Sequence, residues 1–289
     1  VQAFAACPYK HLLDRGFRLR AWEDPERTYQ LQGKDWGSLY HRAVNDLFEW
    51  LKERGWLPLE ASRIPEAETQ LQVILDQEAK TLVAEGAIVN EALLGPAKGA
   101  IRSEIVELLE REAQADGPFV PTDFERGYQD LKIAFAPDRT VTFRGILDRI
   151  DVDDDTKQVR VIDYKTGQYL WKDEDQFRGG RELQLALYNR AAQALYPEHE
   201  ISEALYYHSV AKEKFKQKAC PATAEVGETL EQVLRTLDDT ARAGVFAPVA
   251  DTCDFCDFEG VCGAQREARA ARKRDDPRLA AFLELRTIP

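Results

Sequence analysis

The stretch that most constrains the fold is a pair of β-branched, apolar runs joined by a short acidic turn. The runs are TVTFRGILDRIDV (140–152) and QVRVIDYKTG (158–167), and the turn is DDDT (153–156). Such runs on either side of a polar turn predict an antiparallel hairpin. With the turn centred near residue 155, Asp148 should lie opposite Asp163, because the two numbers average 155.5.

Placing Asp148 opposite Asp163 is unfavourable unless a cation compensates their two negative charges. Directly opposed carboxylates on neighbouring strands repel each other. Mg²⁺ is usually held by one or two carboxylates together with water and phosphate oxygens. Lys165 shares a strand face with Asp163, since strand side chains alternate with a period of two. Taken alone, Asp163 and Lys165 could be an exposed surface ion pair at a strand end, so the metal hypothesis rests on Asp148.

Other acidic residues nearby are weaker candidates. Asp151 and the run 153–155 lie at the turn, where a solvated, Asp-rich loop is the simpler interpretation. Glu125, on the strand before Asp148, is either a further metal ligand or a charge at the strand edge.

Helical and extended patterns alternate around the hairpin. Apolar residues recur every three to four positions from 36 to 51, which predicts a helix that ends near Gly55. The same pattern over 66–115 predicts an all-α region, and we expect one domain over 1–289 with a helical insertion over 56–118. The remaining expectations are a strand over 124–135, a helix over 181–196, a strand over 203–210, a charged turn over 212–218, a helix over 226–244 and a basic C-terminal helix with an apolar end.

These residues together resemble the active-site core of the PD-(D/E)XK nuclease superfamily, and in particular of its RecB-like branch. GILDRID and DYKTG carry the two carboxylates and the lysine. GSLYH (37–41) matches the G-x-x-x-H motif of that branch, and QLALY (184–188) matches its Q-x-x-x-Y motif, in the expected order. The resemblance implies an α/β fold in which a central mixed sheet is flanked by helices.

The resemblance also implies roles for individual residues. The ligands of Mg²⁺ or Mn²⁺ would be His41, Asp148, Asp163 and the backbone carbonyl of Tyr164. Lys165 would orient the attacking water and stabilise the charge of the transition state. Gln184 and Tyr188, at i and i+4 on one helix face, would lie beside the site and contact the scissile strand.

The five cysteines favour metal ligation or simple burial over disulfides in a chain that looks cytosolic. Cys253, Cys256 and Cys262 offer three thiolates within ten residues, one fewer than zinc or a four-iron cluster requires. Cys220 is the nearest fourth thiol in sequence. RecB-like nucleases of the AddB kind, and CRISPR-associated exonucleases, use one cysteine before the nuclease core and three after it to bind a [4Fe-4S] cluster. The resemblance therefore implies that Cys7 pairs with the segment 253–262.

Two alternatives stay open for these cysteines. Zinc could occupy the same four thiolates, or the cysteines could be reduced and simply buried. In the cluster interpretation the metal is structural and Cys220 is an ordinary thiol.

Composition limits the remaining function classes. A net charge of −12 argues against binding nucleic acid by bulk electrostatics, although carboxylates that hold metal can still meet a phosphate. The sequence has no apolar run long enough to cross a membrane and no signal peptide, so a cytoplasmic protein without a membrane partner is expected. The chain begins with Val and contains no Met, as expected of a piece of a longer protein.

By resemblance, we expect a metal-dependent exonuclease that cleaves single-stranded DNA. It would be the nuclease domain of a helicase–nuclease that acts in double-strand break repair, with a helicase domain or subunit as its partner. The chain has no G-x-x-x-x-G-K-[ST] phosphate loop of its own. The alternatives are a free-standing exonuclease of the CRISPR-associated type and an inactive nuclease fold that only binds DNA.

Overall fold

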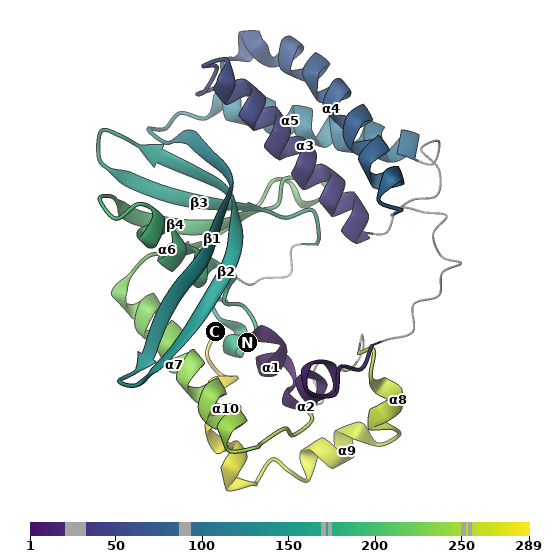
Figure 1. Ribbon diagram of the computed structural model, residues 1–289, viewed down its shortest axis with the longest axis vertical. Helices are drawn as coiled ribbons and strands as arrows, with labels where there is room; N and C mark the ends of the chain where they lie inside the picture. Colours follow the sequence, from purple (N-terminus) through teal and green to yellow (C-terminus); the bar gives the residue numbers. More distant parts are fainter. Residues whose placement is uncertain (21–32, 87–93, 169–171, 173–174, 250–252, 254–255) are drawn as a thin grey trace.

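A five-stranded mixed sheet forms the centre of the molecule (Figure 1). The computed structural model describes residues 1–20, 33–86, 94–168, 172, 175–249, 253 and 256–289. The strands, in spatial order, are β1 (Val120–Ala136), β2 (Arg139–Asp153), β3 (Gln158–Tyr164), β4 (Glu200–Tyr207) and β5 (Gln217–Pro221). Among the described strands, only β3 and β4 pair in parallel, and helix α6 (Gln184–Leu195) lies between them in the sequence. The predicted α/β fold with a mixed sheet is confirmed.

The predicted register of the β2–β3 hairpin is also confirmed. The strands pair Arg149 with Ile162 and Val152 with Val159, and the same register places Asp148 opposite Asp163 one step further along. The turn is fixed by Asp153, whose side chain accepts hydrogen bonds from the backbone of residues 155 and 156. Asp153 is therefore buried in the turn and is not a solvated loop residue.

Helices cover both faces of the sheet because its side chains alternate between two apolar layers. Ile162 and Tyr164 pack against α3 (Gly33–Glu53), α4 (Ile64–Ala84) and α5 (Gly95–Gln114). Val159 and Val161 point to the other face, which is covered by α6 and α7 (Ala224–Arg242). Asp163 lies between Ile162 and Tyr164 and so faces α6, on the edge of this second layer.

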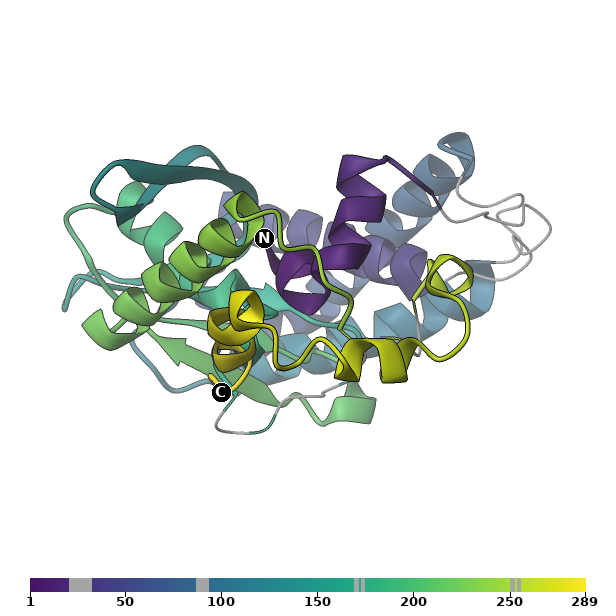
Figure 2. The same cartoon turned by 90° about the horizontal axis from the view of Figure 1, so that it is seen from below.

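Both ends of the described chain meet on the α7 side. There α1 (Gln2–Ala6) and α10 (Ala280–Leu285) join the same core, and Arg286 Nη1 donates a hydrogen bond of 2.8 Å to the carbonyl of Ala5. Gly179 has a φ of +65°, and a side chain there would lie 2.7 Å from the backbone of Arg286. Helices α2 (Pro8–His11), α8 (Glu259–Cys262) and α9 (Arg266–Ala271) lie together at one end of the molecule (Figures 1 and 2).

One local expectation is confirmed in part and one is wrong. The charged turn predicted over 212–218 is present up to Lys216, but its last two residues belong to strand β5, because β4 offers a free edge that the local sequence does not reveal. The C-terminal segment is not one continuous basic helix. Helix α9 stops at Ala271, and the side chain of Asp276 then caps a separate turn that begins at Pro277.

Helices α4 and α5 both lie inside the range 56–118, but the division into one domain with an insertion stays a prediction. Within the described ranges, none of the helices is at once long enough and apolar enough for a bilayer-spanning segment.

Candidate active site and cysteine cluster

The two opposed carboxylates differ sharply in their surroundings. Asp148 Oδ2 accepts a hydrogen bond of 3.0 Å from the backbone N–H of Tyr164 and lies 3.1 Å from Nδ1 of His41. Asp163 is only 2% exposed, and its Oδ1 accepts a hydrogen bond of 2.8 Å from Nε2 of Gln184. Its other oxygen contacts the ammonium of Lys165. Asp163 and Lys165 are therefore not an exposed surface pair.

Helix α6 organises the lysine. Gln184 accepts a hydrogen bond of 3.1 Å from Lys165 Nζ through Oε1, and its Nε2 lies 2.6 Å from the hydroxyl of Tyr188. The hydroxyl of Tyr206 donates to the same Oε1 at 3.2 Å, and the Tyr206 ring centroid lies 4.6 Å from Lys165 Nζ. The fold thus brings both helix residues of the Q-x-x-x-Y pattern to the carboxylates.

Helix α3 brings His41 to the sheet by a close approach at its first turns. Gly37, four residues before His41, lies so near the DYKTG segment that a Cβ there would be 3.2 Å from the hydroxyl of Thr166. A larger residue at position 37 would require the Thr166 side chain to move by a few tenths of an ångström. The glycine and the histidine of the G-x-x-x-H pattern therefore both lie on the face of α3 that meets the sheet, since residues at i and i+4 share a helix face.

Two further residues, which no sequence motif indicates, support the site. Tyr206 pairs with Asp163 in the parallel register of β3 and β4, and no local pattern predicts that register. His208, fully buried, places Nδ1 3.1 Å from the carbonyl of Gly167 and so fixes the loop that follows Lys165. Burial lowers the pKa of His208, which favours the neutral ring. A buried histidine after a strand is a weak signal by itself.

The site has an excess of negative charge. Burial, followed by the charge of Asp148, raises the pKa of Asp163 to about 6, although Lys165 and His41 act in the opposite direction. Burial lowers the pKa of His41, but its hydrogen bond and ion pair with Asp148 raise that pKa more, so the net shift is upward. The carboxylates thus favour cationic partners.

Glu125, on β1, adds a third carboxylate beside Asp148 and Asp163, and the three form an acidic row across the sheet. It lies between the pairs Phe124–Arg149 and Arg126–Leu147 of β1 and β2, which places it beside Asp148. Its φ is +42°, a left-handed conformation that is rare outside glycine. Burial and then Asp148 raise the pKa of its carboxyl. Glu125, Asp148 and Asp163 therefore follow one another across the sheet.

This donor set fits Mg²⁺ or Mn²⁺ by its chemistry. It offers carboxylate oxygens and one imidazole nitrogen, and the charge excess at Asp163 would be relieved by a cation. Within the described part of the chain, no three His, Cys, Asp or Glu side chains are already gathered closely enough to hold a metal ion. Binding would therefore require small shifts of these side chains, beginning with Lys165, which contacts Asp163.

Asp151 has a structural role and is not part of this row. It is fully buried, and its carboxylate binds Arg149 at 2.5 Å and Arg160 at 2.9 Å. Arg149 also donates to Glu112 of α5 at 2.8 Å and to the hydroxyl of Tyr164 at 3.0 Å. The interpretation of Asp151 as a solvated turn residue is wrong, because it lies on the sheet face that α3 to α5 cover.

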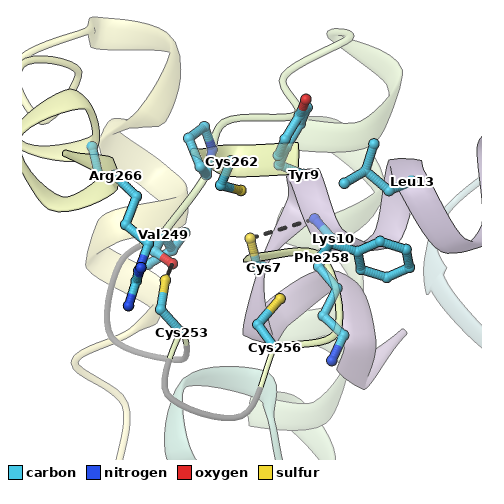
Figure 3. Close-up of a pocket in the computed structure, with 12 residues that line it drawn as sticks. Cys7, Tyr9, Lys10, Leu13, Val249, Cys253, Cys256, Phe258, Cys262 and Arg266 are labelled. Atoms are coloured by element: carbon cyan, nitrogen blue, oxygen red, sulfur yellow. Dashed lines mark hydrogen bonds between the residues drawn. The ribbon is translucent and has the colours of Figure 1, made fainter. Parts of the chain in front are cut away.

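Four of the five cysteines converge on one cavity, as Figure 3 shows. Cys7 comes from the start of α2, where its sulfur accepts a hydrogen bond of 3.4 Å from the N–H of Lys10. The other three are Cys253, Cys256 and Cys262. Burial raises the pKa of the Cys262 thiol, and the neighbouring thiols raise it further. Thiolates are ligands that an iron–sulfur cluster and zinc both take, but the described thiols line one cavity without being close enough to share a metal, so binding would require them to move together.

Cys220 lies apart from this group, in β5. It is 2% exposed within the apolar core, and burial raises its pKa to about 11. It is therefore an ordinary buried thiol with no place in the cavity.

Comparisons with known proteins extend over most of the chain. A family model described as the PD-(D/E)XK nuclease superfamily matches residues 1–263. The B subunit of the ATP-dependent helicase/deoxyribonuclease of Lachnoclostridium phytofermentans is 28% identical over 274 residues, which cover 90% of this chain and 22% of that protein. Proteins of the same name from Moorella thermoacetica and Exiguobacterium sibiricum are 30% identical over 213 residues and 27% identical over 240 residues, covering 68% and 77% of this chain and 18% of each relative. The chain thus spans about a fifth of the length of the curated relatives it matches.

Proposed function

The chain belongs to the PD-(D/E)XK nuclease superfamily, and on that premise we propose that it is the deoxyribonuclease domain of a helicase–nuclease acting in double-strand break repair. Its substrate would be single-stranded DNA, cleaved from an end. One observation carries the proposal above all others. Asp148, Asp163, Lys165 and Gln184 meet on adjoining elements with the lysine held against the buried carboxylate.

The metal would be Mg²⁺ or Mn²⁺, held by His41, Asp148, Asp163 and the carbonyl of Tyr164, with Glu125 as a further candidate. When bound, such a metal supplies charge neutralisation at the phosphate and a more acidic water. Lys165 would donate a hydrogen bond to the attacking water. Its ammonium is already aimed by Gln184 and the Tyr206 ring.

Gln184 and Tyr188 would bind the scissile strand. The Tyr188 hydroxyl is mostly buried, and burial followed by the charge of Asp163 raises its pKa, so it stays protonated and can donate to a phosphate oxygen. An acidic chain can hold a phosphodiester in this way, because the local donors and the metal meet the phosphate directly.

Metal dependence tests this function. The purified chain is expected to shorten end-labelled single-stranded DNA in the presence of Mg²⁺ or Mn²⁺, and to lose this activity completely in EDTA. Adding back metal should restore it, because the ligands are side chains that survive chelation. The measurement is product length against time on a denaturing gel.

Three outcomes decide between the candidate functions. Progressive loss from an end supports the exonuclease. Binding without cleavage under every metal condition would leave the inactive DNA-binding module as the better explanation. Activity that persists in EDTA would contradict the assigned ligands. A helicase domain or subunit as partner remains part of the proposal, because the names of the relatives describe helicase-associated subunits.

We propose that the four converging cysteines hold a structural [4Fe-4S] cluster, with zinc as the alternative. Joining Cys7 to Cys253 would close a loop of 246 positions (253 − 7). By analogy with disulfides, a loop of that length corresponds to about 5 to 6 kcal/mol of stabilisation in the chain-entropy model. The cluster would then lock the two ends of the domain together.

Cys256→Ser tests the cluster, with Cys220→Ser as the matched control. After anaerobic purification, the parent chain and Cys220→Ser should contain iron and sulfide and absorb in the visible range. Cys256→Ser should lose the colour and the iron, and should melt at a lower temperature. Stoichiometric zinc without iron would refute the iron–sulfur proposal in favour of zinc. Equal metal content in all three proteins would refute both.

A further inference from the structure

A hollow of ≈360 Å³ opens to solvent beside the cysteine cavity. The two share Tyr9, Pro248, Cys262 and Arg266, and none of the residues of the catalytic group around Asp163 lines the hollow. Helix α9 and the turn after it form one wall, at the end of the molecule where α2 and α8 also lie (Figure 1). The hollow is therefore a separate feature from the candidate active site.

The α9 wall carries three cations that form no ion pair within the described structure, although the charge of Lys273 acts on the nearby Asp276. Arg269, Arg272 and Lys273 are exposed and line the hollow, and none of them forms an ion pair with a residue that the structure describes. Arg266, by contrast, pairs with Glu259. Among the described residues, no acidic side chain lines the hollow. In a chain with a net charge of −12, such a group of cations is a local exception.

Two aromatic rings line the same hollow. Tyr9 comes from α2 and Phe246 from the segment that follows α7, and both are half-buried. Proteins bind single-stranded nucleic acids with cations that line the sugar–phosphate backbone and with aromatic rings on which the bases stack. Phe246 also packs edge-on against Phe4 of the core, so the ring is held in place. An acidic peptide would use the cations but not the exposed parts of the two rings.

We propose that this hollow is a second DNA-binding site, in which Arg269, Arg272 and Lys273 hold the phosphates of a single strand and Tyr9 and Phe246 contact its bases. The choice of DNA rests on the proposed function, because a domain that cleaves strands from an end benefits from a grip outside the reacting nucleotides. Cys262 and Arg266 border both cavities, so the fold of the cysteine segment sets the position of the cations.

The test measures strand binding in EDTA, where cleavage does not interfere. The probe is a fluorescein-labelled oligothymidylate, and its Kd is measured by fluorescence anisotropy at several salt concentrations. The variant is Arg269→Gln/Arg272→Gln/Lys273→Gln in the full chain. Its Kd should rise about tenfold, and the slope of log K against log salt should fall by about 2, since each lost phosphate contact on a single strand removes ~0.7.

Two further variants make the result specific. Lys80→Gln/Lys132→Gln/Lys212→Gln removes the same three charges from exposed positions on α4, β1 and the loop after β4, and should bind the strand like the parent. Arg269→Lys/Arg272→Lys keeps the charge and should keep most of the salt dependence.

The proposal is overturned if the α9 variant binds with the Kd and slope of the parent, or if the control triple loses as much affinity. It is also overturned if polyglutamate competes as strongly as unlabelled oligothymidylate, since the hollow would then be a site for acidic protein. Because no cleavage is measured, a failure of the nuclease proposal would appear separately, in the metal-dependence experiment.

Discussion

Asp163→Asn is expected to abolish DNA cleavage and, at the same time, to stabilise the metal-free chain above pH 6. Loss of one carboxylate ligand should lower the rate by at least about 10³-fold, since a bound metal supplies several kcal/mol of charge stabilisation. The stability gain follows from burial. Asp163 is nearly inaccessible, and its pKa is raised to about 6 by burial and by Asp148.

The sign of the pH dependence follows from proton binding. Between the unfolded pKa of 3.8 and the folded value of about 6, the folded chain binds more protons at Asp163 than the unfolded chain does. The contribution of Asp163 to stability is therefore lost as pH rises through this window, by about 2 to 3 kcal/mol for a shift of this size. Asparagine does not titrate, so this loss should disappear in Asp163→Asn.

Lys165→Met is the matched comparison, because it should be inactive for another reason. It removes the ammonium that contacts the Asp163 carboxylate and leaves that carboxylate buried with less compensation. Its metal-free stability at pH 7.5 should therefore fall, whereas that of Asp163→Asn should rise. Urea unfolding in EDTA at several pH values measures both.

If Asp163→Asn were less stable than the parent at pH 7.5 without metal, the site would not hold the charge excess described above. If it cleaved DNA at a rate near that of the parent, Asp163 would not be a metal ligand. Either result would be clear, because unfolding and cleavage are measured separately on the same preparation.

Arg149→Ala is expected to cause the largest loss of stability among single substitutions outside the apolar core. Arg149 is 1% exposed, pairs with Asp151 of its own strand, and joins the sheet to α5 through Glu112. Its guanidinium also lies over the Phe48 ring of α3, 5.1 Å from the centroid. Removing one partner from such a buried network typically costs about 3 to 5 kcal/mol, because the remaining charges stay buried without it.

The control is Arg139→Ala, which removes a partly exposed arginine from its pairs with Asp238 and Asp239. Pairs open to solvent contribute much less than fully buried ones, so this variant should lose far less stability than Arg149→Ala. Equal losses in both variants, measured by urea unfolding at constant pH and salt, would show that the buried network does not hold α5 on the sheet. Arg149→Ala should also weaken metal activation, because His41 belongs to the helix layer that this network anchors.

The sequence predicted the hairpin well because its signals are local. Turn chemistry at Asp153 and the period of two along both strands fixed which residues face each other, and Asp148 lies opposite Asp163 as expected. The helices that carry His41 and Gln184 were also predicted from their own apolar periodicity. Strand β5 could not be predicted in this way, since QKACP pairs only because β4 offers an edge.

The surroundings of the acidic residues could likewise not be predicted from the local sequence. Asp151 and Asp163 come from neighbouring strands of similar composition. Asp151 neutralises Arg149 on the sheet face that α3 to α5 cover, whereas Asp163 contacts Lys165 on the opposite face. Alternation predicts that they point to opposite faces. It does not predict what covers each face, and that decides whether a carboxylate stabilises the fold or is available for chemistry.

The sequence by itself determined the pairing of β2 with β3, the order of the motifs and the residues that could act together, because the hairpin depends on contacts between near neighbours in the chain. The resemblance also paired Cys7 with the segment 253–262, and the fold brings Cys7 and Cys262 to one cavity across 255 positions (262 − 7). Tertiary structure alone decided that Tyr206 supports Lys165 and that Arg269 and Tyr9 border one hollow. Such contacts form only after the helices pack on the sheet, since their energy comes from burial between distant segments and not from any local preference.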